Sequence, residues 1–147
     1  MLNHLCGRQP MASEDLDSPA ADEPAAQQAR KFQRELTAGL TSLVLLATLA
    51  GADEDLYGYQ IARRLAVERA DPGPFKQGTL YPVLRNLSAS GLLTSRVVPS
   101  YSGPPRRYYR ITPQGRAVLQ QWLQAWTATR DYVDAVVLPN RTEETPA

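Results

Sequence analysis

Apolar residues recur at intervals of three and four in the first part of the chain, which is the pattern of helices that bury one face. The first predicted helix runs from about Ala29 to Gly51. A second helix is expected to begin with the acidic residues 53–55 at its N-cap and first turn, where negative charge is favourable, and to reach about Arg69. A Pro- and Gly-rich run at 71–74 then ends it. The apolar face of the first helix comprises Phe32, Leu36, Leu40, Leu43, Val44 and Ala47.

A third helix is predicted over residues 77–90. Pro82 would cost a hydrogen bond in mid-helix, so we expect the helix to start near Thr79, with the proline in its first turn. Gly91 is the expected C-terminal stop. One side of this helix is apolar and the opposite side is small, basic and polar. The apolar side comprises Leu80, Val83, Leu84 and Leu87.

Two short strands are predicted at residues 92–98 and 106–111, and the Pro- and Gly-rich segment between them indicates a hairpin with a long tip. Thr112 followed by Pro113 is a strong helix start, with the threonine as N-cap. The last helix is expected to continue to about Leu138, before Pro139, which makes it roughly 39 Å long.

So long a helix exceeds what one small domain can cover. Its apolar residues recur at spacings near 3.5, which is typical of a helix that pairs with a copy of itself, so we expect a homodimer. They are Val118, Trp122, Ala125, Thr129, Tyr132, Val133 and Val136.

The order of elements, three helices, a hairpin and a long helix, is that of a mainly α (α+β) winged helix-turn-helix. The predicted organisation is a disordered acidic extension at 1–28 and a winged helix-turn-helix DNA-binding domain at 29–111. A dimerisation helix at 112–138 and a disordered tail at 139–147 follow.

Net charge is +1, which by itself does not indicate a nucleic-acid partner, but the charges are unevenly distributed. Residues 1–29 hold one basic and five acidic side chains, whereas residues 61–116 hold ten basic and two acidic ones, a net charge of +8. A basic module attracts a polyanion because binding releases condensed counterions. A solvated basic surface is the alternative.

Several classes of protein are disfavoured. No apolar run approaches the roughly 20 residues that cross a bilayer, and the first residues lack the features of a secretory signal, so a cytoplasmic protein is expected. Cys6 is the only cysteine, which rules out an internal disulfide. The sequence has no phosphate-binding glycine motif and no metal-spaced cluster, and its one histidine, His4, lies in the N-terminal tail. We therefore expect neither an enzyme nor a cofactor or metal.

Four sequence blocks closely resemble the signature of the PadR-like transcriptional regulators, in the short form with a single C-terminal helix. They lie in the right order within residues 36–137 and read YGYQI at 57–61, GTLYPVL at 78–84, GLL at 91–93 and GPPRRYYRITPQG at 103–115. The chain departs from the family at two positions: Lys76 stands where a small hydroxyl residue is common, and Gln60 where a glutamate is common.

The resemblance implies a dimeric regulator, usually a repressor, that binds double-stranded operator DNA with an inverted repeat. The third helix would enter the major groove, and the wing would touch the adjacent backbone or minor groove. A winged helix used only for protein interaction is the alternative, and the basic residues speak against it. The candidate DNA-binding residues have side chains of the types that reach base edges and phosphates. They are Lys76, Gln77, Thr79, Tyr81, Arg85, Asn86, Arg106 and Arg107.

Trp122 and Trp126 lie one turn apart on the last helix and have two interpretations. They are either packed core that anchors the dimer or the lining of an aromatic slot between subunits. The slot is suggested by the resemblance to PadR-like proteins that bind flat hydrophobic effectors. A small hydrophobic or aromatic effector bound there would release the regulator from DNA.

Overall fold

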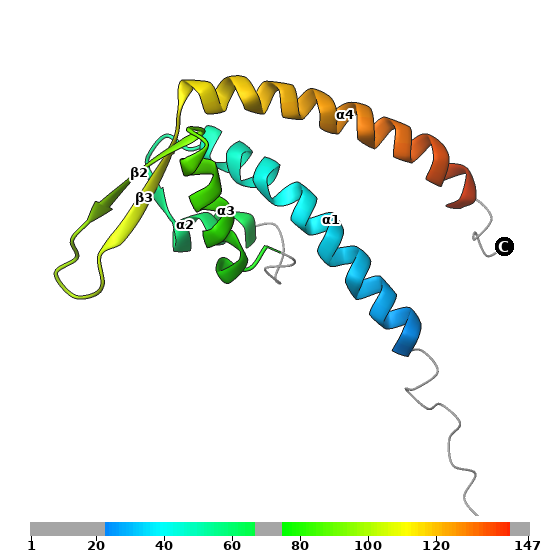
Figure 1. The fold of residues 1–147 in the computed structure, drawn as a ribbon, viewed down its shortest axis with the longest axis horizontal. Coiled ribbons are helices and arrows are strands. Elements are labelled where there is room, and N and C mark those ends of the chain that lie inside the picture. The colour runs from blue at the N-terminus through cyan, green and yellow to red at the C-terminus, as the bar shows by residue number, and fades with distance from the viewer. Residues whose placement is uncertain (1–22, 67–74, 142–147) are drawn as a thin grey trace, which may run out of the picture.

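The computed structural model describes residues 23–66 and 75–141, and in these the predicted mainly α, winged helix-turn-helix fold is confirmed. Figure 1 shows four helices and a small antiparallel sheet. In chain order the elements are α1 (Glu23–Ala50), β1 (Leu56–Tyr57), α2 (Gly58–Ala66), α3 (Gln77–Ala89), β2 (Leu93–Val98), β3 (Arg106–Ile111) and α4 (Pro113–Arg141).

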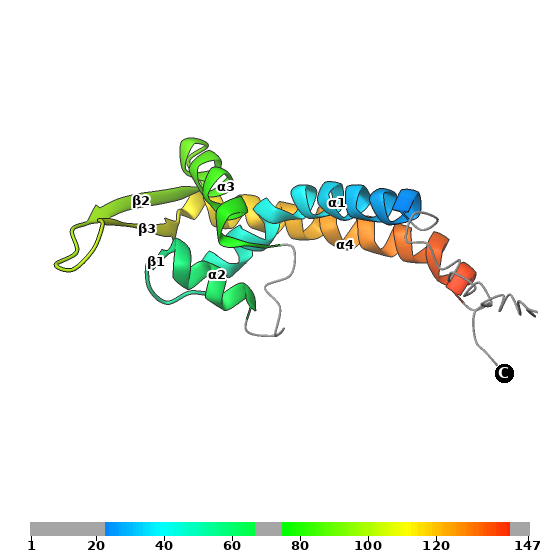
Figure 2. The same ribbon diagram turned by 90° about the horizontal axis from the view of Figure 1, so that it is seen from below.

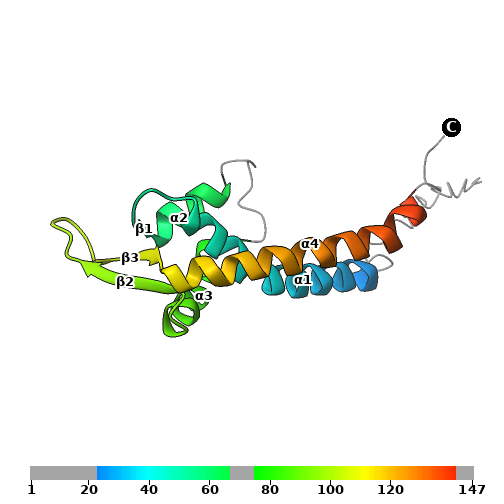
Figure 3. The same cartoon turned by 90° about the horizontal axis from the view of Figure 1, so that it is seen from above.

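The winged domain occupies one end of the molecule. The β2–β3 hairpin, which is the wing, projects from it in one direction, and α1 and α4 extend in the other (Figures 1 and 2). The two long helices contact each other near the winged domain and diverge towards their far ends (Figures 1 and 3). The wing and the free ends of the long helices are therefore at opposite ends of the molecule.

The sheet has the strand order β1-β3-β2, and both pairings are antiparallel. β2 and β3 are the two predicted strands, and they pair from Leu93 opposite Ile111 to Val98 opposite Arg106. The two-residue β1 was not predicted; its Leu56, which is buried, pairs with Tyr109. This short strand ties the start of α2 to the base of the wing.

A single cluster of buried side chains forms the core. Burial of a leucine contributes about 1.5–3 kcal/mol, so this cluster accounts for most of the apolar stabilisation of the winged domain. The predicted apolar face of α3 is confirmed, since three of its four residues are buried and Val83 packs against them. The cluster comprises Leu45, Leu46, Leu49, Leu56, Ile61, Leu80, Leu84, Leu87, Leu92, Leu93, Tyr109, Ile111 and Leu119.

The predicted start of α3 was wrong by two residues, because the helix begins at Gln77 and Pro82 lies in its interior. The Thr79 N–H and hydroxyl both donate to the Lys76 carbonyl, at 3.0 and 2.7 Å, and close the first turn. Pro82 cannot donate to the carbonyl of Gly78, but Gly78 is exposed, so water can satisfy that group.

The C-terminal stop of α3 is confirmed. Gly91 has a positive φ of 77° and its N–H donates to the Ser88 carbonyl, while the Leu92 N–H reaches the Leu87 carbonyl at 3.0 Å. These two bonds form a Schellman motif, in which glycine takes the left-handed conformation without strain. The N-cap of α4 is confirmed too, since the Gly115 N–H donates to the Thr112 hydroxyl at 2.9 Å.

Both long helices extend further than predicted. α1 begins at Glu23 rather than Ala29, so residues 23–28 are helical, because Pro24 suits the first turn and the Ala and Gln residues after it are good helix formers. α4 continues through Pro139 to Arg141, where a proline so near the helix end interrupts only the last turn. The rest of the predicted extension and tail, at 1–22 and 142–147, lies outside the described residues.

The predicted beginning of the second helix was also wrong. α2 starts at Gly58, and residues 53–55 precede β1 instead of forming an N-cap and first turn. β1 occupies the intervening positions, so the acidic run is separated from the helix by a strand. The predicted end of this helix near Arg69 lies outside the described residues. None of the helices described is long and apolar enough to cross a membrane.

Candidate nucleic-acid interface

α3 turns a polar face outward because its leucines are held in the core. Leu80, Leu84 and Leu87 are buried, which fixes the rotation of the helix about its axis. The exposed positions are Gln77, Gly78, Thr79, Tyr81, Pro82, Arg85, Asn86 and Ala89. All the candidate DNA-binding residues of this helix are thus on its open side.

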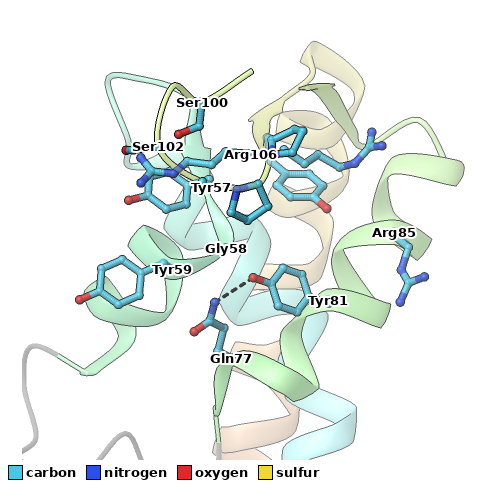
Figure 4. Close-up of a pocket in the computed structure, with 14 residues that line it drawn as sticks. Tyr57, Gly58, Tyr59, Gln77, Tyr81, Arg85, Ser100, Ser102 and Arg106 are labelled. Carbon is cyan, nitrogen blue, oxygen red and sulfur yellow. Dashed lines mark hydrogen bonds between the residues drawn. The ribbon is translucent and has the colours of Figure 1, made fainter. Parts of the chain in front are cut away.

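A hollow of about 610 Å³ lies between this face and the wing (Figure 4). We call it the wing hollow. β1 contributes Tyr57 to it, the start of α2 contributes Gly58 and Tyr59, and the wing tip contributes Ser100 and Ser102. The structure brings five of the eight candidate residues to the wing hollow, namely Gln77, Tyr81, Arg85, Arg106 and Arg107.

The other three candidates lie elsewhere. Lys76 and Thr79 line a separate groove, beside Arg34 and Thr37 of α1. Asn86 is exposed on α3 and lines neither hollow. Lys76 is the N-cap residue, and its side chain makes no capping hydrogen bond. Its carbonyl instead accepts a hydrogen bond from the Thr79 hydroxyl, so the helix start does not need the hydroxyl residue that is common at position 76 in the family.

Two of the three arginines of the wing hollow contact uncharged partners. The Arg106 guanidinium lies 4.6 Å from the centre of the Tyr57 ring, and Arg107 donates from Nη1 to the Ser95 hydroxyl at 3.0 Å. Among the described residues, none of Arg85, Arg106 and Arg107 pairs with a carboxylate. Their positive charge is therefore available to an external anion.

Two other arginines of the basic module share one carboxylate. Arg96 donates from Nε to Asp55 Oδ2 at 2.9 Å, and Arg110 donates from Nε to Asp55 Oδ1. Hydrogen bonds from both arginines hold the pKa of the Asp55 carboxyl below its ordinary value, and the bond from Arg96 has the larger effect. We call this trio the wing lock, because it ties the hairpin to the loop before β1.

Sequence reasoning missed the wing lock because it depends on strand register. Arg96 lies opposite Tyr108 and Arg110 lies two residues further along β3, so both arginines fall on the same face of the sheet. Asp55, expected near a helix N-terminus, instead lies between them. Counting charge along the chain could not reveal which of the basic residues have a partner.

The start of α2 is held by its own side chains. The Gln60 amide oxygen accepts the Tyr57 N–H at 3.1 Å, which is one half of a capping box and shows that glutamine can serve where the family commonly has glutamate. The Tyr57 ring meets the Tyr108 ring edge-on with centres 5.4 Å apart. Tyr57 is thereby fixed as the surface on which Arg106 lies.

Trp122 and Trp126 are half-buried and line a groove of about 540 Å³ between α4 and α1 of the same chain. Trp122 also packs against the core cluster. The opposite wall is formed by α1, with Leu36, Leu40 and Leu43 among its residues. The structure thus brings both tryptophans to one groove, and it supplies a wall from α1 that the sequence did not predict.

Comparison with known proteins agrees with this architecture. The model of the Transcriptional regulator PadR-like family matches residues 45–121, which span the winged domain and the first turns of α4. A transcriptional regulator of Mycobacterium tuberculosis is 43% identical over 72 residues, which cover 48% of this chain and 62% of that protein. The chain thus spans less than two thirds of that relative.

Solved structures extend the likeness to most of the chain. A PadR family transcriptional regulator from Eggerthella lenta superposes with a TM-score of 0.63 at 31% identity, covering 82% of this chain and 97% of that one. A transcriptional regulator from Clostridium thermocellum superposes with a TM-score of 0.61 at 26% identity, covering 70% of this chain and 95% of that one. With the family match across more than half of its length, the chain belongs to the PadR-like family of transcriptional regulators.

Proposed function

We propose that the protein is a homodimeric repressor that binds an inverted-repeat operator, with α3 in the major groove and the wing on the adjacent backbone or minor groove. The observation that carries this proposal is the set of three arginines that borders the wing hollow, beside the polar face of α3, and has no carboxylate partner within residues 23–66 and 75–141. Arginines suit phosphate oxygens and guanine edges, and Gln77 and Tyr81 offer the amide and hydroxyl groups that reach bases.

Exposed apolar side chains on the long helices support a dimer. Phe32 on α1 is 64% exposed, and Tyr132 on α4 is 73% exposed, with Val133, Val136 and Val137 beside it. Both sets lie beyond the groove that α1 and α4 form together, whose lining extends from Glu35 on α1 to Thr129 on α4. An exposed apolar surface of this kind marks an association site, and a second copy of the chain would cover it with the same residues.

The experiment starts from duplexes that the wild-type protein selects from a randomised library. Affinity for a selected duplex should fall steeply with salt, because log K decreases by about 0.9 for each phosphate neutralised. Arg107→Ala removes one phosphate contact from each subunit and should therefore reduce this slope by about 2, whereas Arg96→Ala should reduce it less, since Arg96 is already paired with Asp55.

The outcomes separate two classes of protein. Enrichment of a palindromic sequence with the expected slopes supports an operator-binding dimer. A wild-type slope near zero, or no enriched sequence, would contradict the proposal and favour the winged helix as a protein-interaction module.

We further propose that a planar aromatic ligand acts as effector in the groove beside Trp122 and Trp126, which is favoured by its volume and its two indole rings. A ligand that spreads α1 and α4 would alter the spacing of the two half-sites and favour release from DNA. Fluorescence quenching by flat cationic and neutral compounds tests this. Quenching should weaken in Trp122→Phe and in Trp126→Phe; if no compound quenches the wild type, the rings are packed core.

A further inference from the structure

The first residue of α2 touches the end of a tyrosine ring on α3. Gly58 is buried, and a Cβ added to it would lie 2.7 Å from Tyr81 Cε1 and 2.8 Å from the Tyr81 hydroxyl oxygen. Real Cβ atoms do not approach other atoms so closely, so any side chain at position 58 would displace the ring. Figure 4 shows the Tyr81 hydroxyl pointing from α3 towards the start of α2.

Backbone conformation does not explain a glycine at this position. Among the residues that the structure describes, Gly91 is the glycine with a positive φ, so the backbone of Gly58 is one that alanine adopts freely. Glycine is also a poorer helix former than alanine. The close approach of Tyr81 is therefore the reason that position 58 requires glycine.

The Tyr81 hydroxyl has a second fixed partner. Gln77, one turn earlier on α3, donates from Nε2 to the Tyr81 hydroxyl oxygen at 2.8 Å. This bond occupies the oxygen as an acceptor and leaves the phenolic proton free to donate. The ring is 40% exposed and lies at the edge of the wing hollow, so that proton can reach an external acceptor.

We infer that Gly58 is a positioning residue for DNA recognition: its missing side chain lets α2 and Gln77 hold the Tyr81 hydroxyl where it donates to an acceptor on a base edge in the major groove. Guanine N7 and O6, adenine N7 and thymine O4 are the acceptors available there. This inference rests on the proposed function, because it assumes that α3 lies in the major groove. It assigns to α2 a role in sequence specificity without contact with DNA.

A comparison of variants tests the inference with a selected duplex and a random-sequence duplex of the same length. Gly58→Ala should lower affinity for the selected duplex roughly ten- to hundredfold and leave affinity for the random duplex within about twofold, because one hydrogen bond is lost at each of the two half-sites. Tyr81→Phe, which keeps the ring and removes the hydroxyl, should give the same change. In a Tyr81→Ala background, Gly58→Ala should have no further effect, since the added methyl group then has no ring to displace.

Thermal unfolding of each variant separates positioning from folding. A half-exposed ring can swing outward, so Gly58→Ala should unfold within a few degrees of the wild type. Three outcomes would overturn the inference. Gly58→Ala could lower affinity for both duplexes equally, Tyr81→Phe could leave the ratio of the two affinities unchanged, or the losses from Gly58→Ala and Tyr81→Ala could add in the double variant. If the wild type binds the selected and the random duplex equally, the proposed function is wrong. If the wild type prefers the selected duplex and these variants keep that preference, only the role of Gly58 is wrong. Should Gly58→Ala not fold, Tyr81→Phe alone decides whether the hydroxyl contributes.

Discussion

The winged domain contains the buried apolar cluster, whereas the large apolar side chains of the outer segments of the long helices, residues 23–36 of α1 and 127–141 of α4, are exposed. Leu45 and Leu84 have no exposed surface, while Phe32 and Tyr132 are 64% and 73% exposed. Residues of similar hydrophobicity thus have opposite environments within one chain. The winged domain closes its core with residues of a single copy, and the outer segments have an apolar surface that a single copy does not cover.

Polar contacts differ in the same way. In the winged domain they join distant segments, as where Arg116 of α4 donates to the Ala50 carbonyl at the end of α1. In the outer segments, the described ion pairs join neighbours on one helix, Lys31 with Glu35 and Arg130 with Asp131. Such pairs contribute only a few tenths of a kcal/mol. Substitutions should therefore affect folding in the first region and association in the second.

The largest effect is expected from the double variant Val133→Gln and Val136→Gln, which makes the exposed surface of α4 polar without adding charge. The proposed dimer should dissociate into monomers in this variant, and affinity for a selected duplex should fall on the order of 10²-fold or more, because the two half-sites are no longer bound together. Sedimentation equilibrium and a DNA titration measure the two quantities.

Thr127→Gln is the matched control, because exposed residue 127 lies about 120° around the helix from Val133 and about 180° from Val136. It should change neither the mass nor the affinity. If the double variant stays dimeric, the interface lies elsewhere and the contrast between the two regions has another cause.

A smaller effect is expected from Gly115→Ala in the winged domain. A Cβ there would overlap the Leu92 carbonyl oxygen and lie 2.8 Å from Ile111 Cγ1, so α4 would have to move away from the sheet. We expect a loss of about 1–3 kcal/mol in the free energy of unfolding, measured with urea. Gly78→Ala, with no atom within 4 Å of its Cβ, should instead gain up to about 1 kcal/mol. Equal midpoints for the two variants would contradict the close contact at Gly115.

Local chemistry in the sequence predicted several features of the fold. The apolar face of α3, the glycine after it and the Thr112 cap each depend on residues within a few positions, and spacing alone identifies them. The five candidate residues that border the wing hollow were found by their types on one helix face and one hairpin.

Features that depend on long-range pairing were missed. The strand β1 has two residues and no alternation, the wing lock requires the register of β2 and β3, and the close approach of Gly58 to Tyr81 requires the packing of α2 on α3. The α1 wall of the tryptophan groove similarly depends on how two helices far apart in the sequence pack. Periodicity identifies the buried face of a helix but not the residue that it meets.

The smallest effect is expected from the wing lock and depends on pH. The pKa of Asp55 is lowered in the folded protein, first by Arg96 and then by Arg110, so its carboxylate stabilises the fold above the ordinary pKa of an aspartate, about 3.9. That stabilisation is lost as the pH falls through the lowered value. Asp55→Asn should therefore reduce the free energy of unfolding by up to about 1 kcal/mol at neutral pH, a modest amount because both arginines are largely exposed. The deficit should be constant down to about pH 5 and shrink below about pH 4.

Urea unfolding at pH 7, 5 and 3.5 measures the deficit. Asp131→Asn is the matched control, since Asp131 pairs only with its neighbour on an outer segment and this variant should show no deficit at any pH. A deficit for Asp55→Asn that persists unchanged in acid would mean that shape, rather than charge, holds the wing to the winged domain.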